Sequence, residues 1–146
     1  MPTIVGRFGP VGSYRDPISW VPLIEIALGE YVDTPNTFPN ILKDNVVVLI
    51  DTGAQRCAID QDLATTFGLK EGAGATSVSL GKSAKSRSYL GSLCFSSIPL
   101  SYSGDFASFP FQGQDFQAIL GWDLLRMFDL TLSRKQNLVN LTWVGE

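Results

Sequence analysis

The chain has 146 residues, a formal charge of −3 and a pI near 4.8, and 45% of its residues are hydrophobic while 17% are charged. These values fit one globular domain, and the charged fraction lies below the roughly 25% of an average soluble domain, which suits a chain that associates with a partner. The sequence contains no histidine, which excludes Ser-His-Asp and Cys-His catalysis, HExxH metalloproteases and metal sites that need imidazole.

The two cysteines, Cys57 and Cys94, are too few for a four-cysteine zinc site or a disulfide framework. We expect two free buried thiols, with a disulfide as the alternative, and neither a metal nor a cofactor. The sequence shows no signal peptide and no stretch approaching the roughly 20 apolar residues of a membrane span, which predicts a cytoplasmic protein that does not bind a membrane. The basic residues near 82–87 indicate a solvated loop rather than a nucleic-acid interface.

Residues 1–19 contain three prolines and three glycines and show no hydrophobic period. This composition predicts an extended arm that packs on the domain or on a partner, and residues 20–146 are predicted to form the domain. From Trp20 onward apolar residues alternate, which predicts a first strand, and VVVLI at 46–50 predicts a buried second strand. A polar loop is expected over 29–45 between them.

A short helix is predicted over 63–67, capped by Asp60 or Asp62 and ended by Gly68. A hairpin follows, with strands at 76–80 and 86–95 and a small polar tip at 81–85. The remaining elements are three strands, a helix and a closing hairpin, expected at 97–102, 106–111, 117–120, 122–128, 129–133 and 138–144. Seven to nine strands with two short helices predict a mostly β fold, as a barrel or a sandwich.

Four residues, Asp51-Thr52-Gly53-Ala54, come directly after the second buried strand. A carboxylate in that place is costly unless it is hydrogen-bonded, and Gly53 lets the chain turn sharply and direct N–H groups at the carboxylate of Asp51. An Asx turn that merely ends a strand would use the same residues. The segment by itself leaves both interpretations open.

A second segment, Ile119-Leu120-Gly121, is an apolar run that leads into the helix predicted from residue 122. With both segments in order, the sequence resembles the retropepsin-like (retroviral-type) aspartic proteases from about Trp20 to Trp143. The phrase ILGWDLLR at 119–126 is similar to the bacterial and retroelement members, which have a single domain. The resemblance implies an acid protease fold, a closed β-barrel with one or two short helices that is active as a homodimer.

The resemblance also implies a role for each matching residue. Asp51 would be catalytic, with Thr52, Gly53 and Ala54 as the supporting loop and the Thr52 hydroxyls linking the loops of two copies. Ile119, Leu120 and Gly121 would pass under that loop. A flap hairpin over about 76–90 would close on an extended peptide or protein substrate, and its candidate contact residues are Val78, Leu80, Gly81, Lys82, Ser83 and Ala84. The chain departs from the family in having one glycine at the flap tip and in its residues 1–19, which have no counterpart.

Peptide hydrolysis by this route needs two carboxylates, one that activates a water as general base and one that protonates the carbonyl oxygen. The chain has one such motif, so the resemblance implies a homodimer with Asp51 of both copies at a two-fold axis. Two carboxylates about 4 Å apart repel by roughly 4 kcal/mol at an effective dielectric constant of about 20, so the pair retains one proton into mildly acidic pH. We therefore expect a bell-shaped pH–rate profile with its maximum below about pH 7.

The function of the chain and the placement of its last strand stay open at this point. The chain could keep the fold as a non-catalytic peptide-binding or dimerisation module, or it could be another hydrolase with spaced carboxylates, such as a glycosidase, although no second acid is marked out. The last strand, 138–144, could interleave with a partner or pack within its own chain.

Overall fold

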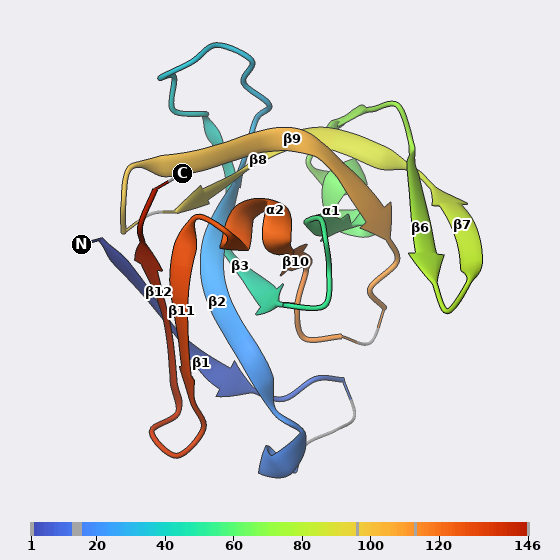
Figure 1. Cartoon of the computed structure of the whole chain (residues 1–146). Coiled ribbons are helices and arrows are strands. Elements are labelled where there is room, and N and C mark those ends of the chain that lie inside the picture. The colour runs from blue at the N-terminus through green and yellow to red at the C-terminus, as the bar shows by residue number, and fades with distance from the viewer. Residues whose placement is uncertain (1, 13–15, 96, 113, 146) are drawn as a thin grey trace.

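The structure is a computed structural model that describes residues 2–12, 16–95, 97–112 and 114–145, apart from the side chain of residue 79. These residues form twelve strands, a 3-10 turn and two short α-helices (Figure 1). The strands are β1 (Thr3–Gly9), β2 (Val21–Gly29), β3 (Ile41–Ile50), β4 (Ala58–Asp60), β5 (Lys70–Glu71), β6 (Ala75–Ser79), β7 (Lys82–Ser86), β8 (Ser88–Phe95), β9 (Leu100–Phe109), β10 (Ala118–Leu120), β11 (Phe128–Ser133) and β12 (Leu138–Trp143). The helical elements are η1 (Pro17–Ser19), α1 (Gln61–Thr66) and α2 (Trp122–Leu125).

Ten of these strands form one sheet in the order β11-β12-β1-β2-β3-β10-β4-β9-β8-β5. An additional pairing between β2 and β8 closes six of them, β2, β3, β10, β4, β9 and β8, into a barrel. Ile24, Val48, Ile59 and Leu120 are completely buried in its core. β6 and β7 pair only with each other and project from one side of the barrel (Figure 1). The mostly β, closed-barrel architecture with two short helices confirms the predicted fold class, although the strands outnumber the seven to nine that were expected.

The β3 strand is longer than predicted. It begins at Ile41, inside the segment expected to be a loop, and its first half carries the polar residues Lys43, Asp44 and Asn45. Asn45 has φ 56°, and the pairing of β2 with β3 shifts register between Ile26 and Gly29. Such an irregular, polar half-strand has no hydrophobic period, so the sequence pattern detected only the buried half of β3.

Three further elements differ from the prediction. Two strands expected at 97–102 and 106–111 are one continuous strand, β9, in which Gly104 lies opposite Gly91 of β8. The second helix ends at Leu125 instead of residue 128, because Phe128 begins β11. The first helix spans Gln61–Thr66 instead of residues 63–67. The Asp60 carboxylate accepts a hydrogen bond from the Asp62 backbone at 3.4 Å, so Asp60 is the correct one of the two predicted caps.

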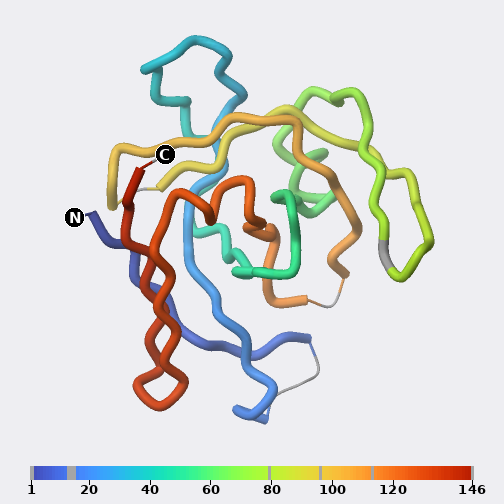
Figure 2. Tube along the Cα trace, viewed as in Figure 1, coloured from blue at the N-terminus to red at the C-terminus, as the bar shows by residue number. Residues whose placement is uncertain are grey.

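The N-terminal segment is extended, and it is built into the sheet. β1 pairs with β2 at one end and with β12 along residues 3–6, and both ends of the chain lie on the same side of the molecule (Figure 2). β12 lies between β1 and β11, and its Val139 and Leu141 are completely buried, so the last strand packs within its own chain. Met1 and residues 13–15 lie outside the described residues, and the domain boundary at residue 20 stays a prediction.

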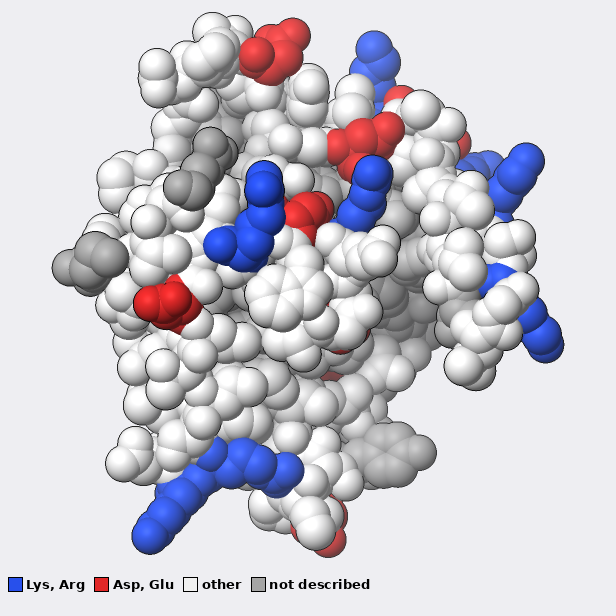
Figure 3. Space-filling view, in the orientation of Figure 1, with Lys and Arg blue, Asp and Glu red and all other residues white. Residues whose placement is uncertain are grey.

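The two cysteines are free and buried, as expected. No helix within the described ranges is long and apolar enough to cross a membrane. Charged side chains of both signs are scattered over the face in Figure 3.

Candidate active site

The turn that follows β3 fixes the Asp51 carboxylate. The Gly53 backbone N–H donates to Asp51 Oδ1 at 2.9 Å, and the Ala54 N–H donates to the Asp51 carbonyl at 3.2 Å. Asp51 is partly buried, while Thr52 and Gly53 are exposed. The Asx-turn geometry is therefore present, and it orients a carboxylate at the surface with one of its oxygens already hydrogen-bonded.

The segment after residue 118 lies under this turn. β10 runs parallel to β3, with Leu120 opposite Ile50, and the Asp51 N–H donates to the Leu120 carbonyl at 3.0 Å. A Cβ at Gly121 would lie 2.6–2.7 Å from backbone atoms of Arg56, so only glycine allows this close approach. The structure thus brings together the two segments that were distant in the sequence, Asp51–Ala54 and Ile119–Gly121.

The first residue of α2, Trp122, makes two contacts with the turn. Its backbone N–H donates to the Ala54 carbonyl at 2.9 Å, and its indole Nε1–H donates to the Thr52 carbonyl at 2.6 Å. The side chain remains 47% exposed. Sequence reasoning placed Trp122 in the helix and missed its contact with the turn, because nothing local in the sequence indicates which way the indole points.

The next residue, Asp123, is the centre of a polar cluster beneath the turn. Its carboxylate accepts hydrogen bonds from the Cys57 backbone at 3.0 Å, from the Cys57 sulfur at 3.1 Å and from the Tyr102 hydroxyl at 3.3 Å. Burial, and then the nearby Asp123 charge, raise the pKa of the Cys57 thiol well above its usual range and the pKa of Tyr102 to about 12. Both groups therefore keep their protons near neutral pH and remain donors to Asp123.

The segment predicted as a flap, about 76–90, contains most of the β6–β7 hairpin, while its last residues, 88–90, belong to β8. Ser79 pairs with Lys82, so the turn consists of two residues, Leu80 (φ 50°) and Gly81 (φ 77°). Two positive φ values are typical of a type I′ hairpin turn. The polar tip predicted at 81–85 is wrong in register: the turn lies at 80–81, and Lys82, Ser83 and Ala84 belong to β7.

Two large apolar side chains of this hairpin are exposed. The Leu80 side chain is 100% exposed and that of Val78 is 74% exposed. Lys82, Ser83 and Ala84 are exposed beside them. All the predicted flap residues are therefore accessible to a ligand.

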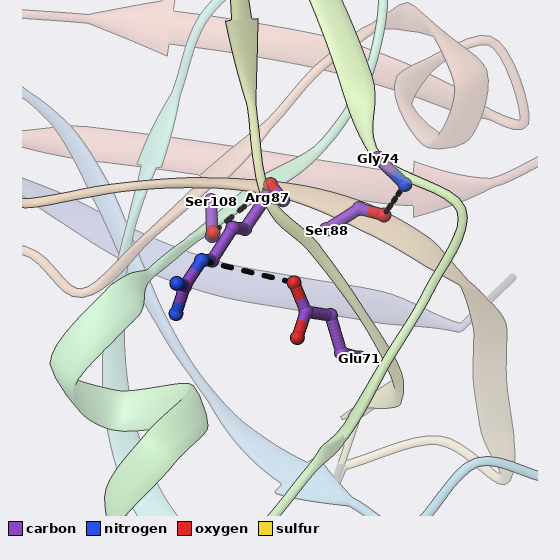
Figure 4. A network of polar contacts seen from close by, with 5 residues as sticks. All are labelled: Glu71, Gly74, Arg87, Ser88 and Ser108. Carbon is purple, nitrogen blue, oxygen red and sulfur yellow. Dashed lines mark hydrogen bonds and ion pairs between the residues drawn. The ribbon is translucent and has the colours of Figure 1, made fainter.

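The root of the hairpin is held by a network of polar contacts (Figure 4). The Gly74 N–H donates to the buried Ser88 hydroxyl at 2.8 Å, and the N–H and hydroxyl of Ser108 both donate to the Arg87 carbonyl at 3.0 Å. An exposed ion pair joins Arg87 to Glu71 at 3.7 Å. The hairpin thus has a fixed base and a free tip.

Two hollows among the described residues lie away from this turn. A groove of about 700 Å³ runs along β1 and β2 and is lined by residues that include Ile4, Arg7 and Glu25. A smaller apolar hollow of about 460 Å³ lies beside Phe38 and Ile41. Neither is lined by Asp51 or its turn, so neither encloses the candidate catalytic carboxylate.

No family model matches the sequence, and no characterised relative matches it. The structure, however, is similar to the crystal structure of a retropepsin-like aspartic protease from Rickettsia conorii, with a TM-score of 0.51 over 97% of this chain and 93% of that chain. The fold is retropepsin-like. At 18% sequence identity the likeness concerns the fold, and the chemistry has to be argued from the residues themselves.

Proposed function

We propose that the protein is an aspartic endopeptidase in which Asp51 from each of two copies forms the catalytic pair. One observation carries this proposal: in a retropepsin-like fold, the Asp51 carboxylate ends a buried strand and accepts the Gly53 N–H at 2.9 Å, on a turn supported from below by Leu120. On the phrase ILGWDLLR we also propose kinship with the bacterial and retroelement members of the family.

In the proposed reaction the two carboxylates share one proton. The ionised carboxylate removes a proton from a water molecule, whose oxygen attacks the carbonyl carbon of the peptide bond, while the protonated carboxyl gives its proton to the carbonyl oxygen. The tetrahedral intermediate then breaks its C–N bond: the protonated carboxyl gives its proton to the amine nitrogen, and the other carboxylate takes a proton from a hydroxyl of the intermediate, which becomes the carboxylic acid product, so the pair again holds one proton. The Gly53 N–H holds one oxygen of Asp51 and leaves the other free to react.

The second copy is needed because one chain supplies one motif. One chain supplies a single Asp-Thr-Gly motif, and Thr52 and Gly53 are exposed beside Asp51, where a second copy can reach them. These observations support a two-fold axis beside Thr52, whose hydroxyls would then link the two turns. Residues 139–142 of β12 already pair with β1 and β11, so we propose that contacts near the turns, and not an exchange of that strand, join the copies.

The β6–β7 hairpin would act as the flap. Its exposed Val78 and Leu80 offer apolar contacts, and its strands offer backbone groups for an extended peptide. Closure of the hairpin on the substrate would exclude water other than the nucleophile from the intermediate.

The experiment that tests this function is a mass-spectrometric screen of a diverse peptide library between about pH 4 and about pH 8. We expect the wild type to cut peptides, with a maximum rate below neutral pH, and Asp51→Asn to cut none. Asp44→Asn, at an exposed carboxylate of β3 away from the turn, is the matched control and should retain activity. Cleavage by Asp51→Asn would exclude Asp51 as the catalyst, and a wild type that dimerises without cutting any peptide would favour the non-catalytic module.

A further inference from the structure

We propose that Trp122 is a positioning residue for Asp51 and that it acts through a single peptide group. The peptide group between Thr52 and Gly53 makes both hydrogen bonds. The Thr52 carbonyl accepts the Trp122 indole N–H at 2.6 Å, and the Gly53 N–H donates to Asp51 Oδ1 at 2.9 Å. The indole and the catalytic carboxylate are thus the two ends of one short hydrogen-bond chain. This inference rests on the proposed function, since it assumes that Asp51 reacts.

The geometry of a peptide group explains how the effect would pass along this chain. A trans peptide is planar, with its C=O and N–H pointing in opposite directions, so fixing the Thr52 oxygen also fixes the direction of the Gly53 N–H. A donor at the carbonyl polarises the same group and strengthens its N–H as a donor. Trp122 would therefore orient the N–H that holds Asp51 and strengthen its hydrogen bond.

Few other contacts fix the orientation of the peptide group between Thr52 and Gly53. Thr52 and Gly53 are exposed, and no other side chain among the described residues donates to the Thr52 carbonyl. The peptide sits at the centre of the turn closed by the Ala54 N–H and the Asp51 carbonyl. Without the indole, rotation of this one peptide would remove the Gly53 N–H from the Asp51 carboxylate.

Trp122 is itself held firmly enough to do this. Its backbone N–H donates to the Ala54 carbonyl at 2.9 Å, so its backbone and its side chain bind the turn at two points. Burial of α2 depends on other residues, because Leu124 and Leu125 are 0% and 2% exposed while Trp122 is 47% exposed. Replacing the indole should therefore affect the turn far more than the stability of the fold.

The direct test compares Trp122→Phe, which keeps an aromatic ring and loses the N–H, with Trp122→His, whose Nε2–H has a similar reach. We expect Trp122→Phe to lower kcat by about tenfold or more with little change in KM, and to move the acidic limb of the kcat profile to higher pH, because the charged carboxylate loses a hydrogen bond. Trp122→His should recover part of the loss. Trp143→Phe, which changes an indole packed on Phe128 away from the turn, is the matched control and should leave kcat unchanged.

A second measurement does not depend on activity. Hydrogen exchange of the Gly53 amide, followed by NMR, should accelerate in Trp122→Phe and return toward the wild-type rate in Trp122→His, while amides of the barrel stay unchanged. Unchanged Gly53 exchange together with unchanged kcat in Trp122→Phe would overturn the positioning role. Activity that survives in Asp51→Asn would instead overturn the proposed function, even if the Gly53 amide responds to Trp122 as expected.

Discussion

The Asp123 carboxylate accepts hydrogen bonds from both the backbone nitrogen of Cys57, at 3.0 Å, and the Cys57 sulfur, at 3.1 Å. Cys57 immediately precedes β4, and Asp123 lies in the first turn of α2, so this contact joins the chain that follows the Asp51 turn to the helix beneath that turn. Tyr102 of β9 completes the cluster. The turn that carries Asp51 is therefore supported by a partly buried polar cluster as well as by the core.

Removal of this acceptor should destabilise the fold. Asp123→Ala would leave the buried Cys57 N–H without a partner, which costs about 1–3 kcal/mol. Urea unfolding should show this loss relative to the wild type. Asp62→Ala, at an exposed acid in the first turn of α1, is the matched control and should change stability by less than about 0.5 kcal/mol. Equal stabilities of the two variants would contradict the supporting role of the cluster.

The stability of the protein should decline in alkali because of Cys94. Burial raises the pKa of this thiol from 9.0 to about 11. The folded protein then holds a proton that the unfolded chain releases, so the contribution is fully present below about pH 9 and is lost as pH rises toward about 11, by about 1.4 kcal/mol per unit of pKa shift.

Urea unfolding of the wild type and of Cys94→Ala at about pH 7.5, 9.5 and 10.5 measures this loss. The stability difference between the two proteins should be constant up to about pH 9 and should then shift in favour of Cys94→Ala. A difference that stays constant across the whole range would contradict the raised pKa.

The tip of the proposed flap offers a test that separates function from folding. Leu80 has φ 50°, a conformation that asparagine adopts more readily than leucine, and its side chain is 100% exposed. Leu80→Asn should leave the melting temperature unchanged or slightly raised and should increase KM several-fold, because the apolar tip is lost. Ile18→Asn removes an exposed apolar side chain at η1, away from the hairpin, and should leave KM unchanged. An unaltered KM in Leu80→Asn would argue against contact of the tip with substrate.

The root of the β6–β7 hairpin should control how readily the hairpin opens. Ser88→Ala removes the buried hydroxyl that accepts the Gly74 N–H at 2.8 Å, at a cost of about 1–2 kcal/mol. Amide exchange over residues 75–86 should accelerate by at least about fivefold, a change of about 1 kcal/mol in local opening. Ser97→Ala, at an exposed residue between β8 and β9, should not alter that exchange. Hairpin exchange that is equally fast in wild type and Ser88→Ala would exclude this anchor.

Local chemistry made part of the fold predictable. The buried half of β3 has a continuous apolar run, and the turn at Asp51 follows from the short-range preferences of aspartate and glycine, so both could be read from neighbouring residues. The Asp60 cap of α1 is equally local. The polar half of β3 and the strand β1 owe their existence to distant partners, and no local pattern predicts them.

The parts of the site that escaped prediction depend on tertiary contacts. The Trp122 indole reaches the turn only because β10 places α2 beneath it, and Tyr102 reaches Asp123 from the far strand β9. The sequence predicted that the hairpin turn begins at Gly81, whereas it begins at Leu80. Leucine is uncommon at positive φ, so its sequence gives no sign that Leu80 occupies the turn. The residues nearest to Asp51 in sequence were therefore predictable, and those that support it from other elements were not.

The central claim is that each active site takes one Asp51 from each of two copies, and subunit mixing tests it most directly. Wild type and Asp51→Asn would be mixed at constant total concentration, allowed to exchange subunits, and assayed on a cleaved peptide. If a pair of Asp51 residues is required, activity should fall with the square of the wild-type fraction, to about one quarter in an equal mixture. A linear fall, to about one half in that mixture, would show that a single chain carries a complete site and would contradict the account.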